Sequence, residues 1–185
     1  MDSTPPIRSA KVLIIGKGPG WELAREFIDT DYNIWGIPQS YNCLEQIIGH
    51  RFDLIFEVHS PKAWKKKKAT LYRLNNQYAS SPKLIVPQRV DGWTDNSYLL
   101  PIPELQSLGL PLLNSFAWMV AYALHRKMDT IAFRGVNLDC NREALGERDG
   151  LLYILGYLKA LGTNLNIERS SGLIRGNELW RSLSL

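Results

Sequence analysis

The sequence predicts an α/β fold in which a mainly parallel sheet of five or six strands lies between layers of helices. Short apolar runs recur along the chain, and most of them are continuous rather than alternating. Continuous runs are typical of strands that are covered on both faces. Stretches with helical periodicity separate most of these runs, which indicates parallel strands joined by right-handed crossovers. Together these features predict a Rossmann-like three-layer sandwich.

The expected elements follow one another in a regular order. Strands are expected at residues 12–15, 33–36, 53–58, 84–86 and 130–133, with a weaker one at 164–167. Helices are expected at residues 21–28, 42–49, 63–77, 115–127 and 150–161. Residues 87–111 interrupt this rhythm with four prolines and little periodicity. A connection of this length is either a lid or binding loop, or a surface excursion without a function of its own.

The length of 185 residues favours a single domain with a substantial core. Residues 1–10 are polar and contain two prolines, so a flexible arm is expected in front of one Rossmann-like domain at 11–185. No apolar run could span a bilayer and no apolar leader is present, so we expect a cytoplasmic protein with no membrane partner. Cys43 and Cys140 form neither a disulfide framework nor a metal-ligand spacing. We therefore predict no metal and no cofactor.

The formal net charge is +4, and much of the positive excess lies at residues 62–68, KAWKKKK. A mildly basic chain is compatible with smaller phosphorylated ligands or with nucleic acid. Four consecutive lysines wrap most of the circumference of a helix, so most of them are expected on a solvated surface. Lys68 shares a helical stripe with Trp64 and Leu71, and it is the lysine placed to reach a ligand phosphate.

The turn after the first strand is the leading candidate site. Gly16, Lys17, Gly18, Pro19 and Gly20 form the sequence GKGPG between this strand and the next helix. Glycines let the backbone come close to a ligand, and a helix N-terminus directs its N–H groups and positive dipole end toward an anion. The spacing matches neither the P-loop nor the full dinucleotide fingerprint. We favour an anion-binding turn over the alternative of a purely structural one.

Residues after the other strands are expected near this turn, because parallel strands deliver their carboxyl ends to one edge of the sheet. Gln39 follows the second strand, and Glu57 and His59 lie at the end of the third. A carboxylate beside a histidine can orient an imidazole for general base work, which makes Glu57 and His59 the candidate catalytic residues. A structural hydrogen bond is the other interpretation of this pair. The candidates after the fifth strand are Gly135, Asn137 and Asp139.

Two helices contribute further candidates for ligand binding. Asn114 or Ser115 begins a helix that is apolar almost all round, so Trp118 and Met119 are expected in the core. The start of this helix either binds an anion or is only capped by these two side chains. Arg148 lies just before the expected last helix, where it makes either a ligand contact or a surface salt bridge.

The order of the motifs resembles that of a family of small uncharacterised phage and prophage proteins. The motifs are IIGKGPG, IWGIPQSYN, LIFEVHSPKAW, NSFAWMVAYAL, IAFRGVNLD and ERDGLLYILGYLKALG. The resemblance covers about Lys11 to Gly162 and implies no particular activity.

A more distant resemblance links the chain to bacterial sialyltransferases that use CMP-sialic acid. Gly16, Gly18 and Pro19 match their GNGPS turn, and Ser115 matches the serine of their TSG helix start. Gly135 matches the glycine of their SGIDF strand end, with Asn137 near its aspartate. This resemblance implies that a nucleotide binds at the carboxyl edge of the sheet.

We therefore expect a nucleotide or nucleotide-sugar as the ligand at this edge, with glycosyltransferase-like chemistry if the protein is an enzyme. The alternative is a non-enzymatic phage accessory protein that binds a host nucleotide signal, a protein or nucleic acid in the host cytoplasm. Nucleic acid is the less favoured partner, and a homo-oligomer is compatible with the sequence. The sequence does not specify the base, the sugar or the acceptor.

Overall fold

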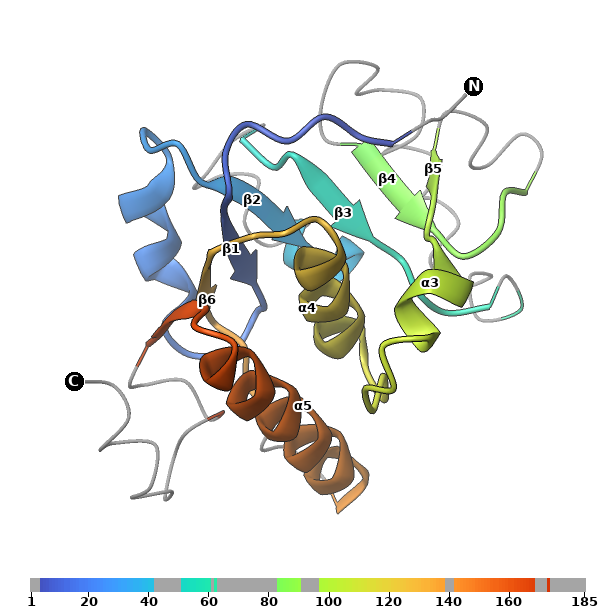
Figure 1. The fold of residues 1–185 in the computed structure, drawn as a ribbon. Coiled ribbons are helices and arrows are strands. Elements are labelled where there is room, and N and C mark those ends of the chain that lie inside the picture. Colours follow the sequence, from blue (N-terminus) through green and yellow to red (C-terminus); the bar gives the residue numbers. More distant parts are fainter. Residues whose placement is uncertain are drawn as a thin grey trace.

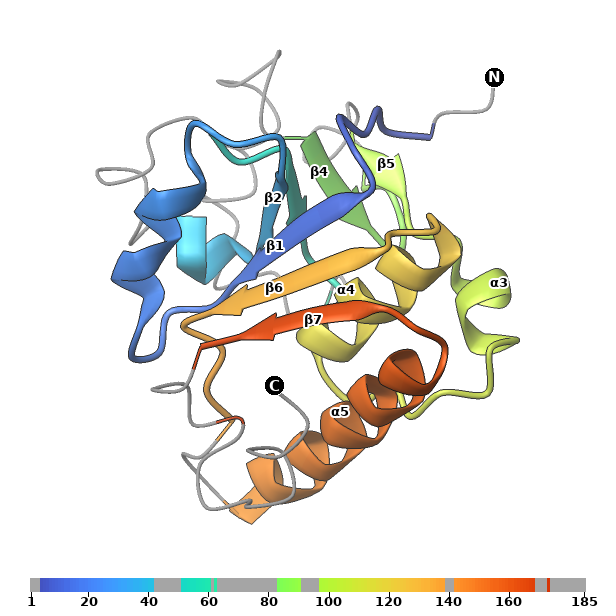
Figure 2. The same cartoon turned by 60° about the vertical axis from the view of Figure 1, so that its left-hand side comes forward.

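The computed structural model describes residues 4–41, 51–60, 62, 83–90, 97–138, 142–168 and 173, with the backbone alone at 142–145. Within this part of the chain, one parallel sheet of seven strands has the order β5-β4-β3-β2-β1-β6-β7 (Figure 1 labels β1 to β6, and Figure 2 labels β7). The strands are β1 (Lys11–Ile15), β2 (Asn33–Gly36), β3 (Leu54–Phe56), β4 (Lys83–Val86), β5 (Tyr98–Leu99), β6 (Thr130–Arg134) and β7 (Asn164–Ile167). The α/β class with a parallel sheet is confirmed, but the predicted strand number of five or six is too low.

The additional strand lies in segment 87–111, which we expected to be irregular. β5 pairs in parallel with β4, through Tyr98 with Ile85 and Leu99 with Val86. The helix α3 (Ile102–Gln106) follows directly. Because β5 has only two residues and Leu99 is 50% exposed, no continuous apolar run marks this strand in the sequence.

Side chains of the strands alternate between two cores, one on each face of the sheet. Val12 and Ile14 of β1 face a core shared with the helices α4 (Ser115–His125) and α5 (Arg142–Ala160). Leu13 and Ile15 face a second core below η1 (Trp21–Phe27). Figures 1 and 2 show helices on both faces of the sheet. This covering explains why the strands are continuously apolar.

Helix α4 begins and packs as expected, with one exception. Asn114 is its N-cap, and the seven side chains at 116, 117 and 119–123 are buried. Met119 is fully buried, as predicted, but Trp118 is only partly buried. The expected core position of Trp118 is therefore wrong, because its side chain borders a pocket described below.

Two other helices differ from their expected form. η1 is a 3-10 helix, and α5 begins at Arg142 rather than at residue 150. Gly146 and Gly150 weaken the helical pattern there, yet a Cβ at Gly150 would lie 3.1 Å from Leu113 Cδ1, so this glycine lets α5 pass close to residue 113. The expected helices at 42–49 and 63–77, including the lysine run, lie outside the described residues. None of the helices that the structure describes is long and apolar enough to cross a bilayer.

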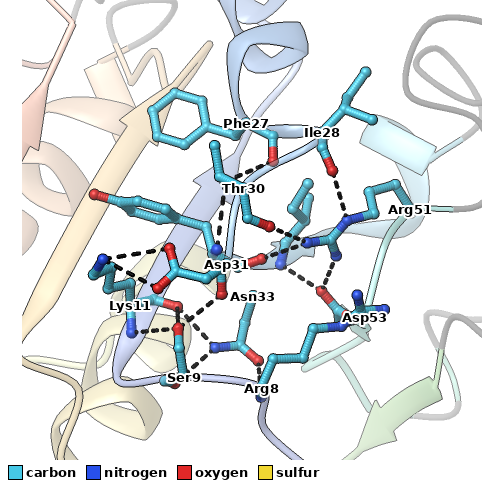
Figure 3. A network of polar contacts seen from close by, with 12 residues as sticks. Arg8, Ser9, Lys11, Phe27, Ile28, Thr30, Asp31, Asn33, Arg51 and Asp53 are labelled. Carbon is cyan, nitrogen blue, oxygen red and sulfur yellow. Dashed lines mark hydrogen bonds and ion pairs between the residues drawn. The ribbon is translucent and has the colours of Figure 1, made fainter.

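A polar network joins the segment before β1 to the amino ends of the first strands (Figure 3). Asn33 is fully buried, and its Nδ2 donates to the carbonyls of Ser9 at 2.9 Å and Lys11 at 2.7 Å. Its Oδ1 accepts from the N–H of Arg8 at 2.7 Å. Farther along the sheet edge, the carbonyl of Ala10 accepts from the N–H of Asp129 at 2.9 Å. These contacts attach residues 8–10 to the body of the fold.

Arg51 lies in the same network and uses all three nitrogens of its guanidinium (Figure 3). Nε donates to the carbonyl of Ile28 at 3.0 Å, and Nη1 donates to Asp53 Oδ2 at 2.7 Å. Nη2 donates to the carbonyls of Thr30 at 3.1 Å and Tyr32 at 2.8 Å. These four hydrogen bonds use every nitrogen of the guanidinium, and they position the loop before β2.

Candidate functional site

The order of strands reverses between β1 and β6. β2 to β5 extend from one side of β1, whereas β6 and β7 extend from the other, and Figure 2 shows β1, β6 and β7 side by side. Ligands of open parallel sheets bind outside the carboxyl ends of the strands at such a point. The loops that meet here carry the glycine turn at 16–20 and Gly135.

These two loops pack backbone against backbone. The N–H of Gly16 donates to the carbonyl of Arg134 at 2.9 Å, and the N–H of Gly18 donates to the carbonyl of Gly135 at 2.7 Å. A Cβ at Gly16 would lie 2.2 Å from the oxygen of Gly135, and a Cβ at Gly18 would lie 2.5 Å from Asn137 Cβ. The contact between the loops therefore requires glycine at 16 and 18 whether or not a ligand binds.

Most of the N–H groups on which the prediction of an anion-binding turn depends donate hydrogen bonds to backbone carbonyls of the protein itself. Besides those of Gly16 and Gly18, the N–H groups of Trp21 and Leu23 donate to the carbonyls of Gly18 and Gly20 at 3.3 Å. η1 is a short 3-10 helix, so it presents only a small dipole. The structural interpretation of the turn thus accounts for these groups.

The remaining residues of the turn are accessible. Lys17 and Pro19 are exposed, and Gly20 has a φ of 84°, in the left-handed region that favours glycine. Lys17 is therefore the residue of this turn that offers a charge to solvent.

A pocket of about 320 Å³ lies at the carboxyl edge, on the face covered by α4 and α5. Its apolar lining residues are Ile37, Val58, Leu113, Phe116, Trp118 and Leu138. Its polar lining residues are His59, Asn114, Ser115 and Glu147. The loops after β2, β3 and β6 all contribute to it, as do both helices. Apolar walls with a few convergent polar groups are typical of small-molecule sites.

Glu57 and His59 contact each other at the edge of this pocket. Glu57 is fully buried, and its Oε1 accepts from the backbone N–H of His59 at 3.1 Å and pairs with His59 Nδ1. The side chain of His59 is 50% exposed. With Glu57 ionised, its carboxylate accepts the proton of Nδ1, and the neutral ring then carries its lone pair on Nε2. This tautomer is the one that a general base needs.

Asn114 joins the two helices that border the pocket. Its Oδ1 accepts from the N–H of Ala117 at 2.8 Å, which caps α4, and its Nδ2 donates to the carbonyl of Glu147 in α5 at 3.0 Å. Since both ends of the amide are engaged, Asn114 positions the helices, and Ser115 at the first turn of α4 is the better candidate for ligand contact.

The other predicted residues are not brought into this pocket. Gln39 is partly buried in the helical turn after β2, and Asn137 lies beside Gly18. Arg148 is inside α5, where its Nε donates to the carbonyl of Leu173 at 3.2 Å. Lys68 and Asp139 lie outside the described residues.

Sequence reasoning missed two charged residues at this edge. Glu147 lines the pocket, but the helix was expected to start after it. Arg134 ends β6 and is only 7% exposed, although an arginine at a strand end is usually taken for a surface residue. No local pattern in the sequence marks Arg134, because its burial depends on contacts with residues far apart in the chain. Among the described residues, no group of three His, Cys, Asp or Glu side chains could hold a metal ion.

Comparisons with known proteins give one structural likeness. No protein-family model matches the chain, and no curated protein matches it. Among solved structures, the chain is similar to the sialyltransferase CstII from Campylobacter jejuni, in complex with the substrate analogue cytidine-5'-monophosphate. The TM-score is 0.56 at 16% sequence identity, over 89% of this chain and 82% of that one. At this identity the likeness is one of fold.

Proposed function

We propose that the protein binds a nucleotide or nucleotide-sugar at the carboxyl edge of its sheet and transfers the group carried by the nucleotide to an acceptor hydroxyl. The observation that carries this proposal is the pocket, where His59, backed by Glu57, comes together with the start of α4. The fold shared with a sialyltransferase solved with cytidine monophosphate supports a nucleotide as the ligand.

The size and lining of the pocket suit the uncharged part of such a ligand. Its volume of about 320 Å³ is at the lower end of the usual range for small-molecule sites. Trp118 and Phe116 offer aromatic surface for a base or a sugar ring. Among the described residues that line the pocket there is no lysine or arginine, so the phosphate is expected outside it.

The chemistry follows from the Glu57–His59 pair. His59 Nε2 takes the proton of the acceptor hydroxyl while the hydroxyl oxygen bonds to the carbon that carries the nucleotide. The bond between that carbon and the phosphate oxygen breaks, and its electron pair leaves with the nucleotide. The buried carboxylate of Glu57 stabilises the imidazolium that forms, as in other carboxylate–histidine pairs.

Calorimetric titration with nucleoside monophosphates and their sugar conjugates tests the binding. We expect Trp118→Ala to weaken the affinity of the bound nucleotide at least about tenfold, because an aromatic contact to the ligand is lost. The matched control is Tyr153→Ala, which removes an exposed aromatic side chain of α5 that does not line the pocket.

Two results would contradict the proposal. If the wild-type protein binds none of these compounds, it is not a nucleotide-binding protein. If Trp118→Ala and Tyr153→Ala bind the same compound equally well, the compound binds elsewhere.

A further inference from the structure

Arg134 is a buried cation that the proposed transfer chemistry does not use. It is the last residue of β6, and only 7% of it is exposed. Its carbonyl accepts from the N–H of Gly16, so its backbone lies at the point where the strand order reverses. Its side chain lies on the face of the sheet covered by η1, where it contacts Phe27. The pocket with His59 lies on the opposite face.

The guanidinium is held on two sides. The ring centroid of Phe27 lies 4.9 Å from Cζ and covers one face of the group. Nη1 donates to the carbonyl of Phe133 at 2.7 Å and to Asn166 Oδ1 at 3.2 Å. These neutral acceptors fix the orientation of the guanidinium and do not neutralise its charge.

Among the described residues, the opposite edge of the guanidinium has no hydrogen-bond partner. Nε is buried without an acceptor, and among the described residues Nη2 donates no hydrogen bond. Nε–H and one N–H of Nη2 point in the same direction, and together they form the edge with which arginine holds a carboxylate or phosphate through two bonds. Arg51 shows the contrast, since every nitrogen of its guanidinium has an acceptor (Figure 3).

The electrostatics of Arg134 fit this description. Burial lowers the pKa of Arg134, while the more distant carboxylates of Glu26 and Glu168 act in the opposite direction. Among the described ion pairs none involves Arg134, so neither carboxylate is in contact with it. A buried charge with no carboxylate in direct contact is costly to the fold, which favours a role other than stability.

We propose that the Nε–Nη2 edge of Arg134 is an anion-binding site at the carboxyl end of β6, for an oxyanion such as a phosphate or carboxylate group. No covalent bond forms or breaks there. Two oxygens of the anion accept hydrogen bonds from the N–H groups of Nε and Nη2. The phosphate of a bound nucleotide and a free phosphate ion share this chemistry.

Titration of the full chain with inorganic phosphate tests the site. We expect Arg134→Met to lower phosphate affinity at least about tenfold, because two charge-assisted hydrogen bonds are lost. Its thermal midpoint should stay equal to or rise above that of the wild type, because an apolar side chain replaces a buried charge. Arg25→Met is the matched control, since it removes one exposed charge from η1.

Arg134→Lys keeps the charge without the paired N–H groups, and it provides the test if Arg134→Met does not fold. We expect it to retain the fold and to lose most of the phosphate affinity. Parallel titrations with cytidine monophosphate and cytidine identify the source of the anion. If the Arg134 variants lose affinity for cytidine monophosphate but keep their affinity for cytidine, the site takes the phosphate of the nucleotide.

The outcomes separate this site from the proposed function. If inorganic phosphate binds through Arg134 but no nucleotide binds, the anion site stands and the proposed function fails. If phosphate does not bind the wild type, or binds the Arg134 variants as well as it does, the anion site is wrong. It is also wrong if Glu26→Gln or Glu168→Gln increases the phosphate affinity and the addition of Arg134→Lys to that variant leaves the increased affinity unchanged.

Discussion

The backbone N–H of Gly18 lies 2.7 Å from the carbonyl oxygen of Gly135, and this hydrogen bond joins the loops after β1 and β6. Gly135 has a φ of 63°, and a Cβ there would lie 2.5 Å from Trp21 Cβ. We expect Gly135→Ala to lower the free energy of unfolding by about 2–4 kcal/mol, from backbone strain and overpacking together. Chemical denaturation measures this loss.

Gly109→Ala is the control for this prediction. Gly109 has a φ of 67°, but nothing lies within 4 Å of the position of its added Cβ. Only the backbone strain applies, at about 1–2 kcal/mol. Equal losses in the two variants would mean that the loops move apart without cost.

The contact between the loops after β1 and β6 also makes Gly18→Val a poor probe of ligand binding, because the valine side chain would collide with Asn137.

The hydrogen bonds at the two ends of the Asn114 side-chain amide can be tested separately. Asn114→Asp keeps the oxygen that caps α4 but loses the N–H donor to the carbonyl of Glu147, so we expect a cost of about 1 kcal/mol. Asn114→Ala loses both contacts and should cost about 2–3 kcal/mol. Thermal unfolding compares the two variants. Equal destabilisation would show that the cap contributes nothing and that only the link to α5 matters.

The imidazole tautomer of His59 provides a test that needs no substrate. The Glu57 carboxylate accepts the proton of Nδ1, so the nitrogen NMR signals of the neutral ring should show protonation at Nδ1. Glu57→Gln should shift the population toward the tautomer protonated at Nε2. His125, in the last turn of α4, is the internal reference whose signals should not change. An unchanged His59 in this variant would contradict the positioning role of Glu57.

Neighbouring residues of α4 should separate stability from binding. Met119 is fully buried, so Met119→Ala should cost about 2–5 kcal/mol of stability. Trp118 is partly exposed at the pocket, so Trp118→Ala should cost less stability and reduce ligand binding more. Denaturation and calorimetry on both variants check this. A larger loss of stability for Trp118→Ala would place Trp118 in the core after all.

The parts of the fold that the sequence predicts well are those in which burial alone decides the pattern. β2 occurs at the expected residues, and β1 and β6 differ from the expected bounds by one residue. β7 also occurs at the expected residues, although it is a partly exposed edge strand. β5 escaped prediction because its edge position leaves Leu99 half exposed. The first turns of α5 escaped because glycine weakens a helical pattern even where tertiary contact favours it, as at Gly150.

The position of the candidate pocket could be predicted from the sequence, but its lining residues less so. Parallel strands bring their carboxyl ends together, and this places His59 with Ser115 in the pocket. The use of the N–H groups of Gly16 and Gly18 by the β6 loop depends on a contact between distant segments, which no local pattern contains. The same holds for Arg134, whose importance appears only when its hydrogen-bond partners are counted.

The central position of β1 has a consequence for the synthesis of the chain. β1 pairs with β2 early in the sequence, but its other edge pairs with β6, and Lys11 meets Thr130 only after well over half of the chain has been made. During synthesis on a ribosome, one edge of β1 therefore stays unpaired while the strands on its other side are made and pair. Contacts of such high sequence separation slow folding, and the junction of the two loops forms among the last. Nascent chains truncated before β6 should accordingly depend on chaperones more than chains that include it.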